Sequence, residues 1–156
     1  MGKITFQSIF NAAWQAFIVE KRPPASDSGG CKYFMPDGRR CGVGWSLPEE
    51  IQEHPDFLNY EGFHQLVFRF PDLFDDQIKQ TSQPRLYRFQ ADLHDHLCTT
   101  AESRWNYPPE EMERKYRVVA DKFGLTIPDK NNTQIAVAHG IGSPEEYLSI
   151  ALSPCL

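Results

Sequence analysis

The sequence lacks a long apolar run, a cluster of basic residues and a dense set of cysteines. No apolar stretch approaches the ~20 residues that a membrane-spanning helix requires, so we expect no membrane span. Lys and Arg number 7 in residues 1–78 and 9 in residues 79–156, against 11 and 10 acidic residues, and the net charge is −5. Nucleic-acid binding requires a basic stripe, so we expect no nucleic-acid partner.

Four cysteines in a chain of 156 residues, with no secretory signal, are more typical of reduced thiols than of a disulfide framework. The N-terminal segment is amphipathic and lacks a small-residue cleavage site, which argues against a signal peptide. These features predict a cytoplasmic protein. The sequence also lacks a phosphate-binding Gly-x-x-x-x-Gly-Lys loop, and Gly42-Val-Gly44 lacks the third glycine of a dinucleotide fingerprint.

The stretch from Cys31 to Pro48 is the most specific local signal. Pro36-Asp37-Gly38 has the composition of a type I turn closed by a left-handed glycine, which predicts a β-hairpin at about residues 31–45. Because side chains alternate along a strand, one face would hold core residues and the other a candidate binding surface. The predicted core face carries Cys31, Tyr33, Cys41, Val43 and Trp45. The predicted binding surface carries Lys32, Phe34, Arg40, Gly42 and Gly44, with Asp37 and Arg39 at the turn.

Gly42 and Gly44 allow two interpretations. Glycine inside a strand marks the close approach of a backbone or of a ligand. The two residues therefore either make room for a helix or end the strand, or else form part of a ligand surface.

Apolar residues at helical spacing predict helices around the hairpin. The first follows Thr5, a plausible N-cap, and ends before Pro23-Pro24. Others are expected at 84–103 and 110–123, the last ended by Gly124. In the helix at 84–103 one stripe is expected to face the core; it holds Leu86, Gln90, Leu93, Leu97 and Ala101, with Phe89 beside it. We therefore expect an α+β fold, with a mainly helical single domain at 1–127 packed around the hairpin. Residues 134–138 are a candidate third strand, in a C-terminal extension (128–156) docked on the same domain.

Two kinds of chemistry are open to the cysteines and histidines. Cys31, Cys41, His94 and Cys98 are zinc-ligand types, although the tight spacing of structural zinc sites is missing; the alternative is that the cysteines are buried hydrophobes. His94-Asp95 has the adjacency of a metal-dependent phosphohydrolase motif. Cys41 or Cys98 could instead act as a nucleophile with His94 as base.

The pattern Cys-x-Tyr-x-x-Pro-Asp-Gly-x-x-Cys-x-x-Gly, followed by Leu47-Pro48 and an acid, resembles a family of small uncharacterised proteins found in phages, prophages and other bacterial genomes. The resemblance extends over roughly residues 5–125 and includes His94-Asp95, Trp105 and Phe123-Gly124-Leu125. It implies a phage or mobile-element context and supplies no mechanism.

From these features we expect a non-enzymatic binding protein that acts through the glycine-bearing hairpin face. Its ligand would be a protein partner with an acidic surface or an anionic small molecule, because arginine and exposed glycine backbone suit both. No cofactor is required unless the cysteines bind zinc. A counter-defence role rests on the phage-like context alone. The alternative is a metal- or thiol-dependent hydrolase that uses His94 with Asp95 or a cysteine, and a third is an assembly subunit.

Overall fold

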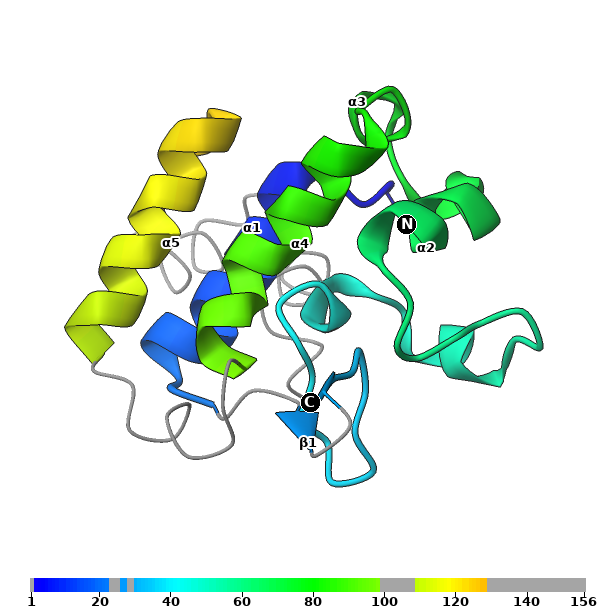
Figure 1. The fold of residues 1–156 in the computed structure, drawn as a ribbon, viewed down its shortest axis with the longest axis horizontal. Helices are drawn as coiled ribbons and strands as arrows, with labels where there is room; N and C mark the ends of the chain where they lie inside the picture. Colours follow the sequence, from blue (N-terminus) through cyan, green and yellow to red (C-terminus); the bar gives the residue numbers. More distant parts are fainter. Residues whose placement is uncertain (1, 23–25, 28–29, 99–108, 129–156) are drawn as a thin grey trace.

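The computed structural model describes residues 2–22, 26–27, 30–98 and 109–128, and within these ranges it leaves out the side chains of 26, 27, 30, 31, 94–98 and 109. Helices dominate the described chain (Figure 1). The α-helices are α1 (Phe6–Ala13), α2 (Phe63–Arg69), α3 (Asp76–Lys79), α4 (Gln83–Cys98) and α5 (Pro109–Phe123). The π-helix η1 (Trp14–Val19) continues α1, and the 3-10 helices are η2 (Gly44–Ser46), η3 (Glu49–Glu53) and η4 (Pro71–Leu73).

The first helix begins where the sequence predicts. Thr5 is the N-cap: its hydroxyl accepts a hydrogen bond from Ser8 N at 2.9 Å, and Ser8 Oγ accepts one from Thr5 N at 2.8 Å. This reciprocal pair satisfies two backbone donors that a helix start otherwise leaves unpaired. The helical run continues through η1 to Val19, and the backbone then turns at Lys21 with φ 54°.

The core is an aromatic cluster with Phe89 of α4 at its centre. The Phe89 ring lies 4.8 Å from that of Phe6 on α1, 6.2 Å from that of Phe63 on α2 and 4.8 Å from that of Phe123 on α5. Phe89 and Phe63 are completely buried. One side chain therefore links four helices that are far apart in sequence, and α4 crosses the middle of the molecule beside α5 (Figure 1).

The described helices after residue 82 follow the predicted pattern. Leu86, Gln90 and Leu93 of α4 are buried, as the apolar stripe predicts. Helix α5 ends at Phe123, and Gly124 follows with φ 65°, the left-handed conformation that a glycine stop requires. The predicted continuation to residue 103, the strand at 134–138 and the rest of the extension beyond Pro128 lie outside the described residues.

The prediction of an α+β fold built around a β-hairpin at 31–45 is wrong. In the described residues, extended pairing is confined to the two-residue pair β1 (Ser26–Asp27) with β2 (Gly30–Cys31) and to isolated bridges, one of them between Phe34 and Arg40. The turn itself forms: Met35 N donates to Arg39 O at 2.8 Å, and Gly38 has φ 93°. The protein is helical, and the turn ends in a single bridge rather than a ladder.

The hairpin fails because each of its two arms finds other partners. Asn59 occupies the backbone of the first arm: Tyr33 N donates to Asn59 O at 3.0 Å, Phe34 N donates to Asn59 Oδ1 at 2.9 Å, and Asn59 Nδ2 donates to Phe34 O at 2.7 Å. The second arm coils into η2, where Trp45 N donates to Cys41 O at 3.2 Å. An asparagine amide presents the same donor and acceptor pair as a peptide unit, so it replaces the neighbouring strand.

Phe34, Arg40, Gly42 and Gly44 of the predicted binding surface are buried by packing contacts. The guanidinium carbon of Arg40 lies 4.7 Å from the centre of the Phe34 ring and 5.5 Å from that of Trp45, and all three side chains are buried. A Cβ on Gly42 would lie 3.0 Å from Leu93 Cβ, and one on Gly44 would lie 2.2 Å from Tyr33 O. Both glycines therefore make room for neighbouring elements, Gly42 for α4 and Gly44 for the Tyr33 backbone.

Candidate functional site

A pocket of about 180 Å³ opens between the Lys32–Tyr33 segment, the loop at 58–62 and helix α4. It is smaller than the ~300–1,000 Å³ typical of sites for drug-sized ligands, so its size suits a single side chain or a small head group. The residues that line it are Lys32, Tyr33, Cys41, Asn59, Tyr60, Glu61, Gly62, Tyr87, Gln90 and Ala91. Hereafter this is called the Glu61 pocket.

The loop that carries Glu61 is held at both ends. Asn59 pairs with the backbone of Tyr33 and Phe34, as described above. At the other end, Phe63 N donates to Gln90 Oε1 at 2.8 Å. These bonds tie the loop to the turn segment and to α4, and they fix the side of the pocket on which Glu61 lies.

The inner wall of the pocket is a hydrogen-bonded pair, Gln90 and Tyr33. Since Gln90 Oε1 accepts from Phe63 N, its amide nitrogen is directed at the phenol, and Gln90 Nε2 donates to Tyr33 Oη at 3.1 Å. Burial raises the pKa of Tyr33 well above its ordinary value; the Cys41 thiol and the charge of Glu61 raise it further, and the Gln90 hydrogen bond opposes them. Tyr33 therefore remains a neutral phenol, which retains its own O–H as a donor.

Glu61 is the acidic residue of the pocket, and its side chain is only 2 % exposed. Its Oε2 accepts a hydrogen bond from Arg69 Nε at 2.8 Å, whereas its Oε1 is buried and has no hydrogen-bond partner in the described structure. A buried carboxylate oxygen without a donor is costly, because water's hydrogen bonds are lost and nothing replaces them. The arrangement leaves one strong acceptor without a partner, buried in a residue that lines the pocket.

Two exposed tyrosines and a lysine frame the opening. Tyr60 is 71 % exposed and Tyr87 is 52 % exposed, although large aromatic side chains tend to be buried. Both line the Glu61 pocket, from the loop and from α4 respectively. Lys32 is partly buried on the opposite segment. The pocket thus combines aromatic surface at its edge with a carboxylate inside.

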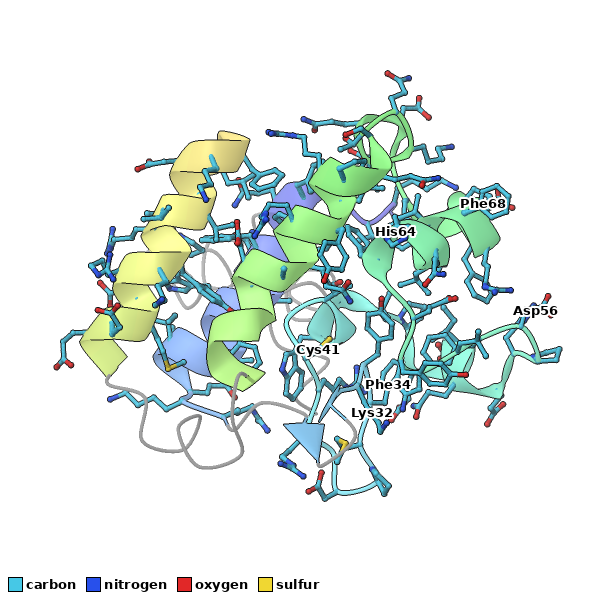
Figure 2. The ribbon with its side chains drawn as sticks, in the orientation of Figure 1. Lys32, Phe34, Cys41, Asp56, His64 and Phe68 are labelled. Atoms are coloured by element: carbon cyan, nitrogen blue, oxygen red, sulfur yellow. The ribbon has the colours of Figure 1, made fainter. Side chains whose placement is uncertain are left out.

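Cys41 brings a thiol to the same pocket. It is 1 % exposed, and its sulfur accepts a hydrogen bond from Gly44 N at 3.4 Å. Figure 2 shows Cys41 and Lys32 on the chain between α4 and the loop that carries Asp56. Cys41 is thus a buried core residue that also lines the Glu61 pocket.

A second hollow lies on the outer side of α2, with a volume of about 410 Å³. It is lined by His64, Gln65, Phe68, Arg69 and Gln83. Phe68 is 83 % exposed and points away from the body of the protein (Figure 2). Arg69 lines this hollow and also pairs with Glu61.

The remaining residues of the predicted binding surface are dispersed. Lys32 lines the Glu61 pocket, whereas Phe34, Arg40, Gly42 and Gly44 are buried. Asp37 and Arg39 stay at the turn.

The turn residues Asp37 and Arg39 pair with each other. Asp37 Oδ1 accepts from Arg39 N at 3.1 Å, and Asp37 Oδ2 accepts from Arg39 Nε at 2.8 Å. The Arg39 backbone N–H, followed by its side chain, holds the pKa of Asp37 below its ordinary value. This pair fixes the turn locally.

The predicted zinc ligands and catalytic residues are placed only in part. The side chains of Cys31, His94, Asp95 and Cys98 lie outside the described residues, so the structure leaves both predictions untested. The β2 strand, which carries Cys31, contacts helix α4, and a Cβ on Gly42 would lie 3.0 Å from Leu93 Cβ. Among the side chains that are described, no group of three His, Cys, Asp or Glu residues could hold a metal ion.

Four residues that line the Glu61 pocket are not predicted as site residues from the sequence: Tyr60, Glu61, Tyr87 and Gln90. One signal was available for Gln90, since a polar residue in an apolar helical stripe indicates a buried hydrogen bond. The sequence holds no similar signal for Glu61, because acidic residues are common in turns such as the one that carries it. Its loop is held by Asn59, which bonds to Phe34, 25 positions away in the sequence.

No family model, curated protein or solved structure matches the chain. Within the part of the chain that the structure describes, no helix is both long and apolar enough to span a bilayer. The functional argument therefore rests on the geometry of the Glu61 pocket.

Proposed function

We propose that the chain is a non-enzymatic binding protein whose binding site is the Glu61 pocket. The observation that carries the proposal is the unpartnered oxygen of a buried carboxylate, Glu61 Oε1, in the wall of a small open cavity. A hydrogen-bond donor from a ligand would satisfy it. The exposed rings of Tyr60 and Tyr87 would add contact area at a low cost in side-chain entropy.

The proposal moves the binding surface away from the glycine-bearing face. Arg40 is buried against the rings of Phe34 and Trp45, so we place the binding site elsewhere. An acidic or anionic partner at the glycine-bearing face stays a prediction. Lys32 is the residue of that face that also lines the pocket. A cytoplasmic location and a phage-type accessory role, including counter-defence, belong to the proposal and rest on composition and on the motif resemblance alone.

A hydrolase is the second candidate, and one observation favours it. Cys41 lines the pocket, and the α4 backbone at Leu93 abuts the adjacent Gly42. That contact brings the turn of α4 that carries His94 and Asp95 toward the thiol. A catalytic thiol would be a thiolate with enhanced reactivity. Binding without chemistry requires no such reactivity, so a Cys41→Ser variant would retain binding.

The test is a panel of small cationic, neutral and anionic fragments titrated into the whole chain, with backbone amide shifts recorded by NMR. We expect at least one class to shift the amides around Tyr33, Glu61 and Ala91. An Ala91→Leu variant, which extends a side chain into the cavity from α4, should abolish these shifts, because leucine fills space and preserves the helix.

Phe68→Ala is the matched control, since it removes a large apolar side chain at the other hollow. It should leave the shifts unchanged. The proposal would be overturned if no class of fragment shifts the amides around the Glu61 pocket. It would also be overturned if the fragments bind the Ala91→Leu variant as well as they bind the wild type. Rapid alkylation of Cys41 by iodoacetamide, at a rate far above that of a free thiol, would favour the hydrolase instead.

A further inference from the structure

We propose that the Glu61 pocket binds an organic cation, either a guanidinium or an alkylammonium head group. This inference rests on the proposed function and names its ligand class. Three observations support it: the carboxylate oxygen without a partner, the aromatic rim, and the size of the cavity.

The acceptor without a partner belongs to a carboxylate whose residue lines the cavity and which forms an ion pair with Arg69. Glu61 Oε2 is already bonded to Arg69 Nε, and Glu61 Oε1 is buried with no partner in the described structure. Hydrogen bonds to an ionised group are stronger than neutral ones, and the strongest donors are N–H groups that carry positive charge. A cationic donor therefore gains more from Glu61 Oε1 than a neutral donor of the same shape.

The rim suits the same ligand. A cation within about 6 Å of a tyrosine ring is attracted by the negative face of the ring, and proteins use aromatic surfaces of this kind to recognise organic ammonium groups. Tyr60 and Tyr87 line the pocket and are both more than half exposed, so their rings are open to a ligand. Tyr33 contributes a neutral phenol from inside, because burial keeps its pKa high.

The cavity limits the size of the ligand to a head group and a short stem. At about 180 Å³ it is too small for a nucleotide or a peptide segment and suits the end of one long side chain or one small amine. The chemistry is the same for a free small cation and for an Arg or Lys side chain on a partner protein. The experiment has to separate these two sources.

Lys32 sets the expected affinity. It is the basic residue among the described lining residues, and its ammonium opposes a second cation. Since Lys32 is only partly buried, water and salt screen its charge, and its long stem lets the head group move outward. Removing this charge should therefore strengthen the binding of a cation.

The test uses N-butylguanidinium and its neutral isostere N-butylurea as probes, titrated into the whole chain by calorimetry at low ionic strength. We expect the guanidinium to bind about tenfold more tightly than the urea, the usual gain from a hydrogen bond to a charged group. Glu61→Gln should remove this preference. Lys32→Met should raise the affinity for the guanidinium about threefold, as expected for the loss of a partly screened like charge.

The two substitutions act in opposite directions within one pocket, which a general disturbance of the fold would not do. If Glu61→Gln proves unstable, the comparison of guanidinium with urea in the wild type and in Lys32→Met still decides the matter. Equal binding of the two probes, or unchanged guanidinium affinity in Lys32→Met, would overturn the inference. A pocket that binds urea or anions but no guanidinium would refute the cation and leave the proposed function standing.

A capped Gly-Arg-Gly peptide separates the two sources. If the peptide binds at least as tightly as N-butylguanidinium, with the same loss in Glu61→Gln, the cation is a side chain of a partner protein. If only the free cation binds, the ligand is a small molecule. Loss of both in Glu61→Gln supports the cation site in either case.

Discussion

Gly44 provides the sharpest test of how the turn segment packs. A Cβ at this position would lie 2.2 Å from Tyr33 O and 3.0 Å from Tyr33 C, both backbone atoms. The Tyr33 backbone cannot retreat easily, because its N–H donates to Asn59 O at 3.0 Å. A Gly44→Ala substitution must therefore move one backbone segment by most of an ångström.

The expected loss follows from the cost of overpacking. Inserting a methyl group into a filled site costs typically about 1–3 kcal/mol, and two backbone segments in contact place Gly44→Ala near 3 kcal/mol. For a chain of this length that corresponds to a fall in Tm of about 6–12 °C. Gly42→Ala should cost less, about 1 kcal/mol, since its Cβ would meet Leu93 Cβ at 3.0 Å and α4 has to give way by only a few tenths of an ångström.

Gly2→Ala is the matched control, because a Cβ there meets nothing within 4 Å. In all three variants, replacing glycine by alanine lowers the conformational entropy of the unfolded chain by the same amount. Differences in unfolding free energy among the three variants therefore report effects in the folded state. The assay is urea denaturation followed by circular dichroism, with thermal melts in parallel. A Gly44→Ala protein as stable as Gly2→Ala would refute the close approach of Gly44 to Tyr33 and the packing built on it.

Two further predictions concern the core and the pocket wall. Phe89→Ala should lower the free energy of unfolding by about 3–5 kcal/mol, because it removes the ring that joins four helices. Phe68→Ala, at an exposed position, should change it by less than about 0.5 kcal/mol. Equal losses for the two variants in urea denaturation would contradict the central position of Phe89 in the core. The folded state raises the pKa of Tyr33, so its contribution to stability is complete below the unfolded pKa near 10 and is lost as the pH rises toward the folded value. The free energy of unfolding should thus fall between about pH 9 and 11 in the wild type, and it should fall less in Tyr33→Phe. Parallel curves of unfolding free energy against pH for the two proteins would show that unfolding releases no proton from the phenol.

The parts of the fold that sequence analysis predicted correctly are those fixed by local chemistry. Thr5 caps a helix, Gly38 and Gly124 take positive φ, and the stripe of Leu86, Gln90 and Leu93 is buried. The cap and the two glycines depend on neighbours within a few residues, where turn and capping rules act, and the stripe follows from helical periodicity.

The hairpin was mispredicted because its outcome depends on a distant residue. Alternation along 31–45 is compatible with two paired strands, but Asn59 supplies the same hydrogen bonds through its amide and backbone. With the first arm occupied, the second arm coils into η2 and places Arg40 between Phe34 and Trp45. Competition between a side chain and a strand for one backbone is a tertiary effect that periodicity cannot register.

The candidate site followed the same logic. Lys32 and Cys41 were identified from the motif, and both line the Glu61 pocket. Glu61 is not predicted, because its loop is held by contacts between residues far apart in the sequence. Asn59 bonds to Phe34, and Gln90 bonds to Phe63 at the start of α2. The prediction that the motif marks a functional surface remains a prediction, now with a defined cavity attached to it.

The most direct test of a cation site in the Glu61 pocket is a crystal structure of the chain with N-butylguanidinium bound. We expect a ligand nitrogen within about 2.7–3.2 Å of Glu61 Oε1, with the ligand lying against Tyr60 or Tyr87. A ligand seated in the hollow of Phe68, or a Glu61 Oε1 that is already bonded to Lys32 with the cavity closed, would contradict it.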